Sequence, residues 1–274
     1  MLRRAILTLT RNSSHIWKYF FQSYKKHCDG YDLFVLDNGS RSGDVEYLTT
    51  YETEVQCMIW MKHNMLFTKG VNTLLAAALG EEFSIGEGNR RLKLIEYIDK
   101  YDQFIVVNPD IEFKEGWDKD LEQNTGIMGF TLVKPNGIIE HAGGIGQGDH
   151  LGRGEEDSGN YQELRDVDWV TFGCVAIHKS VIEKIGKLDE NFPHFGSDRE
   201  FCKLAKKNGI SVKCSGARLI HGFGKSTRPY IFSGIPDDIW KKHVAERRSS
   251  GVFFPEDQSR MQRLDAPGKY LPFR

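Results

Sequence analysis

Polar residues that could bind a ligand stand directly after apolar runs in the first half of the sequence. They are Thr10 and Asn12, then Asp37, then Asn64, and finally Asn108 with Asp110. In open sheets of parallel strands, ligands bind outside the carboxyl ends of the strands. Each residue alone also has an ordinary explanation, because such side chains often bond nearby backbone in turns. Their shared placement predicts a ligand site at one edge of a sheet.

The sequence lacks the glycine-rich loops that commonly bind phosphates. No Gly-x-Gly-x-x-Gly follows the first apolar run, and no Gly-x-x-x-x-Gly-Lys-Ser/Thr occurs anywhere. A hard divalent cation, held by one or two carboxylates and by the phosphates of the ligand, would serve instead, because Mg²⁺ needs few protein ligands. Asp110 is the natural candidate for this carboxylate.

The elements that must position these residues alternate between strands and helices. Strands are predicted at 5–10, 33–36, 55–60 and 104–107, and helices at 14–27 and 72–79. This alternation indicates βαβ units and a mainly parallel sheet. Shorter strands are predicted within 126–134 and 168–178, and a helix at 197–208 with Ser197 as its N-cap. The glycine-rich segment between these strands is expected to be a mobile loop.

The composition indicates a globular chain. Its 274 residues are 39% hydrophobic and 27% charged, with a net charge of −1, which excludes a mainly disordered or polycationic protein. No apolar stretch approaches the roughly 18 to 20 residues that span a bilayer, so neither a membrane span nor a signal peptide is predicted. The five cysteines form no Cys-x-x-Cys pair, which favours a reducing compartment and a cytoplasmic location.

Short motifs occur along the chain in a fixed order. They are Leu36-Asp37-Asn38-Gly39-Ser40, Asn64 to Asn72 with Gly70 between, Val107-Asn108-Pro109-Asp110, Gly137 to Gly143, Val170 to Cys174, Ile185 to Phe192, Ser197 to Cys202, and His221 to Ser226. Together they resemble glycosyltransferase family 2, whose members have the GT-A fold. The resemblance covers roughly residues 4–227.

The resemblance implies an α/β fold with a Rossmann-like, mixed and mainly parallel sheet flanked by helices. Residues 1–227 would form one GT-A domain, with a nucleotide-sugar-binding half at 1–113 and an acceptor and catalytic half at 114–227. Residues 228–274, which the resemblance does not cover, are expected to form an irregular C-terminal extension that packs on the domain. A helix is predicted there at 236–248, and peripheral contact with the inner face of a membrane through this basic tail is an alternative.

The resemblance also assigns roles to single residues. The implied donor-binding residues are Thr10, Asn12, Asp37, Asn64, Asn72 and Gly173, with Asp37 contacting the nucleotide base. The implied ligands of a divalent metal, Mn²⁺ or Mg²⁺, are Asp110, His221 and Asn108. Asn108 stands where the Asp-x-Asp-type motif of the family has its first carboxylate, and an Asn carbonyl oxygen can still ligate a hard cation.

Asp198 matches the catalytic base of the family. Such a carboxylate would take the proton of the acceptor hydroxyl as its oxygen attacks the anomeric carbon. The alternative is structural, because a carboxylate in the first turn of a helix is favoured by the helix dipole, which would also lower its pKa.

The implied function is a metal-dependent, inverting hexosyl- or deoxyhexosyltransferase of polysaccharide biosynthesis. It would use a UDP, dTDP or GDP sugar and a glycan or glycolipid acceptor, and the sequence leaves a nucleic acid acceptor open. One alternative is a nucleotidyltransferase that makes a nucleotide sugar, although residues 8–12 are not the glycine- and arginine-rich loop of that class. Another alternative is a catalytically silent nucleotide- or sugar-binding module.

Overall fold

The central strands are apolar runs that are buried on both faces. In the computed structural model, which describes residues 2–81, 90–92, 101–146 and 148–222, these are β1 (Arg4–Thr10), β2 (Asp32–Asn38), β3 (Cys57–Met61) and β5 (Gln103–Val107). Continuous apolar runs of this kind are typical of parallel strands that helices cover on both sides. β1 pairs in parallel with both β2 and β5, and β2 pairs in parallel with β3. The carboxyl ends of all four strands therefore lie at one edge.

The second half of the chain extends this sheet with strands of both directions. The sheet order is β11-β13-β7-β12-β5-β1-β2-β3-β4, in which β12 is antiparallel to both β5 and β7, while β13 is parallel to β7. The strands are β4 (Arg90–Leu92), β6 (Ile111–Glu112), β7 (Ile127–Val133), β8 (Ile139–His141), β9 (Gly144–Ile145), β10 (Asp149–His150), β11 (Arg165–Asp166), β12 (Cys174–His178) and β13 (Val212–His221). The mixed, mainly parallel α/β sheet predicted from the sequence is confirmed.

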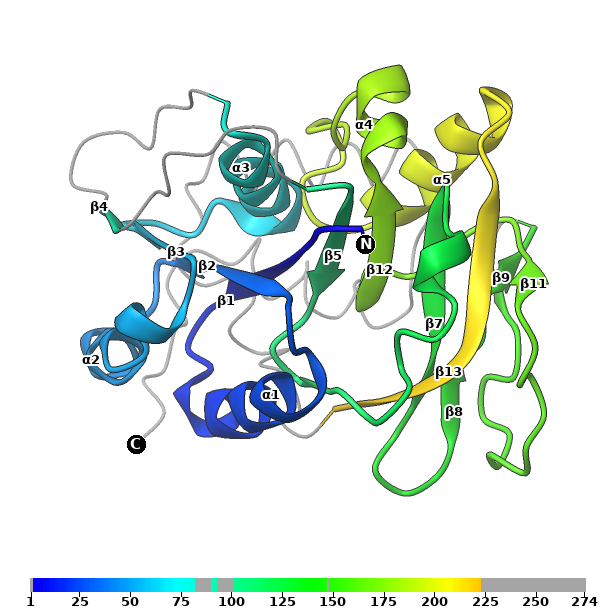
Figure 1. Cartoon of the computed structure of the whole chain (residues 1–274), viewed down its shortest axis with the longest axis horizontal. Coiled ribbons are helices and arrows are strands. Elements are labelled where there is room, and N and C mark those ends of the chain that lie inside the picture. Colours follow the sequence, from blue (N-terminus) through cyan, green and yellow to red (C-terminus); the bar gives the residue numbers. More distant parts are fainter. Residues whose placement is uncertain (1, 82–89, 93–100, 147, 223–274) are drawn as a thin grey trace, which may run out of the picture. The chain divides into compact units, whose positions relative to one another are not determined.

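Helices cover both faces of the sheet (Figure 1). α1 (Ser14–His27) and α2 (Ser42–Thr49) lie on one face, and α3 (Leu66–Leu79), α4 (Lys179–Ile185) and α5 (Ser197–Lys207) lie on the other. Short 3₁₀ helices occur at Glu52–Glu54 and Leu121–Gln123. Gly70 lets α3 approach β1 closely, because a Cβ atom at this position would lie 2.5 Å from Cδ1 of Leu9.

Helix α1 is amphipathic, and its apolar face covers the sheet. It buries Trp17 and Phe20, which join Phe113 and Trp117 in an aromatic cluster on that face. Full burial of each large aromatic side chain contributes about 2 to 3 kcal/mol to folding, before the loss of conformational entropy. This packing holds α1 against one face of the sheet.

Three local predictions differ from the structure. α3 begins at Leu66 and not at residue 72, because Asn64 accepts a hydrogen bond from the Leu66 N–H and starts the helix earlier. The N-cap of α5 is Gly196, with a φ of 81°, and not Ser197. The described part of the glycine-rich segment forms a hairpin of β9 and β10, with backbone bonds between Ala142, Gly143 and Leu151, where a mobile loop was expected.

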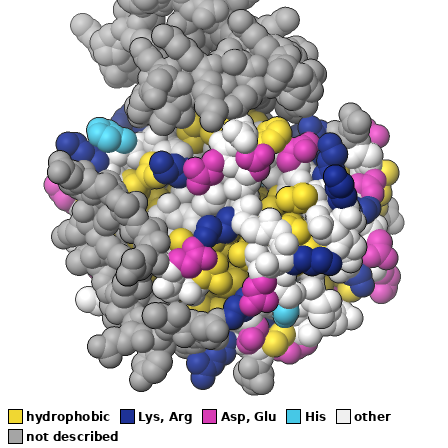
Figure 2. Space-filling view, turned by 90° about the horizontal axis from the view of Figure 1, so that it is seen from above, with side chains coloured by type: hydrophobic (Ala, Val, Ile, Leu, Met, Phe, Trp, Pro, Cys, Tyr) yellow, Lys and Arg dark blue, Asp and Glu magenta, His cyan; other side chains and the backbone are white. Residues whose placement is uncertain are grey.

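The predicted C-terminal extension and its helix at 236–248 lie outside the described residues, and the proposed division of the chain stays a prediction. On the face shown in Figure 2, acidic and basic side chains are interspersed over the described surface, which agrees with the net charge of −1. Among the residues that the structure describes, no helix combines the length and apolar character that crossing a membrane requires.

Candidate active site

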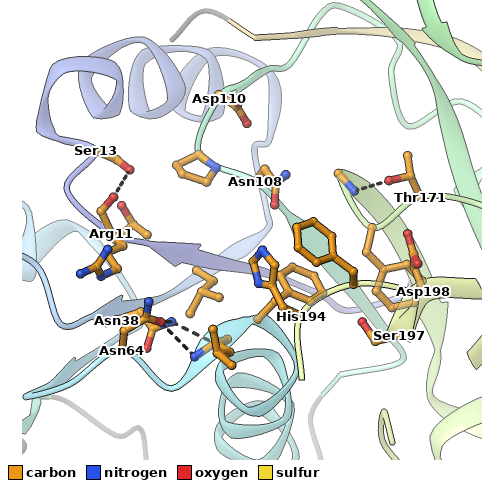
Figure 3. A pocket seen from close by; sticks show the side chains of 18 of the residues that line it. Arg11, Ser13, Asn38, Asn64, Asn108, Asp110, Thr171, His194, Ser197 and Asp198 are labelled. Carbon is orange, nitrogen blue, oxygen red and sulfur yellow. Dashed lines mark hydrogen bonds between the residues drawn. The ribbon is translucent and has the colours of Figure 1, made fainter. Parts of the chain in front are cut away.

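A cavity of about 330 Å³ lies at the carboxyl ends of the central strands. Of the residues singled out from the sequence, it is lined by Thr10, Asn64, Asn108, Asp110, Gly173 and Asp198. Figure 3 shows that Arg11, Asn38 and Asn64 lie on one side of the cavity, while Thr171 and Asp198 lie on the other. The residues that line the cavity therefore come from both halves of the chain.

Asn12 and Asp37 hold two loops together, and neither is among the residues that line the cavity. The Asn12 side chain accepts the Arg41 N–H at 2.9 Å, and the Asn12 N–H donates to the Ser40 hydroxyl at 2.8 Å. The Ser40 N–H donates to Asp37 at 3.1 Å, and its hydroxyl also donates to this carboxylate. Burial raises the pKa of Asp37 to about 6 even though both Ser40 hydrogen bonds oppose the rise. Asp37 is therefore a carboxylate that is costly to keep charged.

Thr10 presents a buried polar atom at the cavity. The residue is 1% exposed, and its hydroxyl has no hydrogen-bond partner among the described residues. Arg11, the next residue, also lines the cavity, and burial lowers its pKa while the Asp37 carboxylate opposes this. A buried hydroxyl and a guanidinium that line one cavity suit a polar, negatively charged ligand, because unsatisfied buried polar groups are costly.

Asn64 and Asn38 together hold the turn that begins α3. The Asn38 amide donates to Asn64 Oδ1 at 3.0 Å, and its own Oδ1 accepts the Met65 N–H at 2.7 Å. Leu66 has a φ of 66°, in the left-handed region that costs a branched side chain about 1 kcal/mol or more. The hydrogen bonds of the paired amides offset this strain, so Asn38 and Asn64 stabilise the turn before α3. Both residues also line the cavity.

Asn72 is not among the residues that line the cavity, and its side chain bonds another segment instead. Its amide donates to the Leu188 carbonyl at 2.9 Å and to Glu190 at 3.1 Å, and its Oδ1 accepts the Leu188 N–H at 3.0 Å. These bonds attach α3 to the segment that leads toward α5. We therefore leave Asn72 out of the donor site that we propose below.

Asp110 and His221 are brought together by strand pairing. β6, which follows Asp110, pairs with the end of β13, where His221 stands opposite Ile111. Nε2 of His221 lies 3.3 Å from Oδ1 of Asp110, and its Nδ1 lies 2.7 Å from Oε2 of Glu140. Burial opposes the charged imidazolium, but the hydrogen bonds with Asp110 and Glu140 outweigh it and raise the pKa of His221 to about 10. The hydrogen bond with His221 also lowers the pKa of Glu140.

This donor set fits a divalent cation. Two ligands that bind one ion at about 2.1 Å in adjacent positions stand about 3 Å apart, close to the 3.3 Å between His221 and Asp110. The described residues contain no cluster of three or more His, Cys, Asp or Glu side chains suited to an ion. Most of the coordination positions would therefore fall to the phosphates of a ligand and to water, as Mg²⁺ and similar ions allow.

Asp198 lies in the first turn of α5 and faces the cavity. Its Oδ1 accepts the Arg199 N–H at 2.8 Å. Burial raises the pKa of Asp198 above the usual value of 3.8, and the backbone hydrogen bonds offset only part of this rise. The lowering expected from the helix dipole is therefore outweighed by desolvation, which makes this carboxylate a stronger base.

Gly173 lines the cavity beside the strand-end residues. A Cβ atom at this position would lie 3.0 Å from Cδ1 of Leu132 and 3.7 Å from Cε1 of His221. The Gly173 carbonyl accepts the Asn108 N–H at 2.9 Å. A side chain here would press on Leu132, and close approach of a ligand to the glycine stays a prediction.

Curated relatives share only part of their length with the chain, and no protein-family model matches it. Over 134 residues it is 32% identical to the O-antigen biosynthesis protein RfbC of Myxococcus xanthus, which covers 44% of this chain and 10% of that protein. Over 152 residues it is 26% identical to the low-salt glycan biosynthesis hexosyltransferase Agl10 of Haloferax volcanii, with 52% and 46% covered. The matches thus span less than half the length of either relative.

Solved structures extend the likeness to nearly the whole chain. GalNAc-T7, crystallised with UDP, GalNAc and Mn²⁺, matches with a TM-score of 0.57 and 12% identity over 90% of this chain and 48% of that one. TarS of S. aureus matches with a TM-score of 0.56 and 12% identity over 93% and 45%. Both are GT-A enzymes. The chain has the GT-A fold. The fold and the resemblance to GT-A glycosyltransferases expected from the sequence are thereby confirmed.

Several residues at this GT-A cavity escaped the sequence analysis. Arg11 and Asn38 are sequence neighbours of Thr10 and Asp37, so their position at a strand end could have indicated them. His194 and Phe195 also line the cavity, but they come from the segment before α5, which has no strand-end pattern. Glu140 falls within a motif of the resemblance, yet only the folded chain brings it to His221.

Proposed function

We propose that the chain is an inverting glycosyltransferase that moves a sugar from a nucleotide-diphosphate sugar to a hydroxyl group of a glycan acceptor. The GT-A fold supports this function, as do relatives named for O-antigen biosynthesis and for glycan biosynthesis. The observation that carries the proposal is the placement of Asp198 across one cavity from Arg11, Asn38 and Asn64 (Figure 3). A donor held on one side would leave its anomeric carbon open to attack from the other.

The donor side is formed by the ends of β1, β2 and β3. The Thr10 hydroxyl and Arg11 line the cavity and are suited to hydrogen-bond and charge contacts with a nucleotide. Asp37, at the end of β2, would contact the base when the donor is bound, with Asn12 holding the neighbouring loop. We propose UDP, dTDP and GDP sugars as donor candidates, and UDP sugars would be tested first because GalNAc-T7 was crystallised with UDP.

Asp110 and His221, with the carbonyl oxygen of Asn108, would hold a divalent cation near the diphosphate. Such a cation, Mn²⁺ or Mg²⁺, acts as a Lewis acid that stabilises the leaving nucleoside diphosphate. Asp110 supplies the negative charge for this site, and His221 supplies a neutral nitrogen when its Nε2 is unprotonated. The Mn²⁺ in the GalNAc-T7 crystals supports Mn²⁺ as the first ion to test.

Asp198 would act as the general base. It would take the proton of the acceptor hydroxyl while the oxygen attacks the anomeric carbon from the face opposite the nucleotide, which inverts the configuration. A carboxylate with a raised pKa is better matched to proton transfer near neutral pH. Only one carboxylate is required, because no covalent sugar intermediate forms in a single displacement.

Release of nucleoside diphosphate tests the function directly. The chain is incubated with UDP, dTDP and GDP sugars, Mn²⁺ and oligosaccharide acceptors, with and without EDTA. We expect turnover with one donor class and its loss in EDTA. Nucleotide binding with no turnover of any donor would instead favour the silent binding module, and absence of both would overturn the proposal.

Asp198→Asn separates chemistry from donor binding. Turnover should fall about 10² to 10⁴-fold, the usual contribution of general-base assistance, while nucleotide affinity stays near that of the wild type. Glu200→Gln is the matched control, because Glu200 lies in the same first turn of α5 but outside the cavity lining. Turnover of Asp198→Asn within a few-fold of the control would refute the assignment of the base.

A further inference from the structure

We infer that Glu140 is a positioning residue that fixes the tautomer of His221 and so directs its Nε2 toward a divalent cation shared with Asp110. The inference rests on the metal site of the proposed function. Glu140 itself is not a ligand in this arrangement, because its carboxylate meets the opposite nitrogen of the ring, Nδ1, at 2.7 Å.

A bulge in β8 sets the direction of the Glu140 side chain. In the pairing of β7 with β8, Leu132 stands opposite His141 and Val133 stands opposite Ile139. Glu140, between His141 and Ile139, therefore has no residue of β7 opposite it. Extra residues of this kind re-aim side chains and are frequent beside active sites. Val133 also pairs with Ile220 of β13, the neighbour of His221. β7 therefore separates Glu140 from β13, and the glutamate side chain reaches across it to the imidazole.

The hydrogen bond to Glu140 determines which ring nitrogen is available. An imidazole that donates its Nδ1–H to a carboxylate keeps its lone pair at Nε2 when it is neutral. Nε2 lies 3.3 Å from Oδ1 of Asp110, so the ring nitrogen that Glu140 does not contact is the one beside this carboxylate. A divalent cation held by Asp110 and His221 would take the place of the proton on Nε2.

The surroundings keep the Glu140–His221 pair in place. The side chain of His221 is 18% exposed and that of Glu140 is 30% exposed, so water competes only weakly for their hydrogen bond. His141, the next residue of β8, is buried, and its Nε2 accepts the Thr171 N–H at 3.2 Å. β8 thus supports both the metal side of the cavity and the turn that leads to Gly173.

Metal affinity of the protein without any donor sugar tests the inference. The signal of free Mn²⁺ in electron paramagnetic resonance is titrated with the wild type, Glu140→Ala, Glu140→Gln and Glu112→Gln. Glu112→Gln is the control for charge, because Glu112 lies two residues from Asp110 and pairs with Lys114 instead of His221. The folded state of each variant is checked by its thermal unfolding.

Glu140→Ala should weaken Mn²⁺ binding about 10- to 100-fold, the usual effect of removing a carboxylate behind a metal-binding histidine. Glu140→Gln should weaken it less, because its amide oxygen still accepts the Nδ1–H, and Glu112→Gln should stay within about threefold of the wild type. Affinities of both Glu140 variants within twofold of the wild type would overturn the inference. If Glu140→Ala does not fold, the same criterion is applied to Glu140→Gln alone.

The outcome is separate from that of the proposed function. A wild type that binds no Mn²⁺ but turns over a nucleotide sugar would refute the role of Glu140 and leave glycosyl transfer standing. A wild type that binds Mn²⁺ through the Glu140-dependent site but turns over no donor would support Glu140 and count against the activity.

Discussion

Asp37→Asn should make the free protein more stable at neutral pH while it weakens nucleotide binding. The wild-type carboxylate is 1% exposed and must stay ionised in a poorly solvated position above its pKa of about 6. The amide of Asn can accept the Ser40 N–H with its oxygen and donate to the Ser40 hydroxyl with its nitrogen. The substitution therefore removes the buried charge and keeps the hydrogen bonds.

The size and the pH range of the effect follow from the pKa. The folded pKa of about 6 lies above the ordinary value of 3.8, and this difference corresponds to about 3 kcal/mol. Between these two values the folded state binds more protons than the unfolded state, so wild-type stability falls as the pH rises. The stability advantage of the variant should be near zero at pH 4, grow between pH 4 and 6, and level off above that.

Urea denaturation at pH 4.5, 6 and 8 measures this difference, and calorimetry with the nucleoside diphosphate measures affinity. Asp29→Asn is the control, because Asp29 is exposed and a surface change of this kind stays within about 0.5 kcal/mol. A variant that is less stable than the wild type at pH 8, or one whose advantage does not change with pH, would refute the electrostatic reasoning. Unchanged nucleotide affinity would refute the place of Asp37 in the donor site.

Further substitutions test the packing and the site. Gly216→Ala should lower the free energy of unfolding by about 2 kcal/mol or more in urea titrations, because its Cβ would lie 1.8 Å from the Gln162 carbonyl oxygen. The control Gly43→Ala has open space around it and should be neutral or stabilising. Equal changes in stability for the two variants would contradict the close packing at Gly216. Asn72→Ala should lose about 1 to 3 kcal/mol of stability by the same measurement, because it leaves buried backbone groups of the 188–190 segment without partners. Nucleotide affinity should not change. A loss of affinity would return Asn72 to the donor site. The acid limb of the kcat/KM profile should lie at higher pH than that of an ordinary carboxyl group, because burial raises the pKa of Asp198, and a limb below pH 4 would contradict its role as the base.

Local sequence signals determined most of the first half of the fold. α1 has the bounds 14–27 predicted from its apolar spacing, and the predicted strands before residue 110 fall within one to two residues of the observed ones at most ends. Buried parallel strands are apolar throughout, and polar residues mark their ends, so both signals can be read without knowing any distant contact. The placement of Thr10, Asn64 and Asp110 at one cavity followed from the same rule.

Contacts between distant segments decided what the sequence left open. α3 begins early because Asn38 and Asn64 meet at the turn before it. The Asn72 side chain is engaged in hydrogen bonds because the 188–190 segment packs on that helix. His221 reaches Asp110 because β13 pairs with β6.

Glu140 reaches His221 because a bulge redirects its side chain across β7. The contacts of His221 with Asp110 and with Glu140 cannot be predicted from the local sequence, because strand register depends on packing between residues far apart in the chain. The sequence by itself therefore determined the edge of the sheet at which the cavity forms and the residue types found there. The tertiary structure alone decided which of those side chains face each other, because that depends on burial and pairing across the whole sheet.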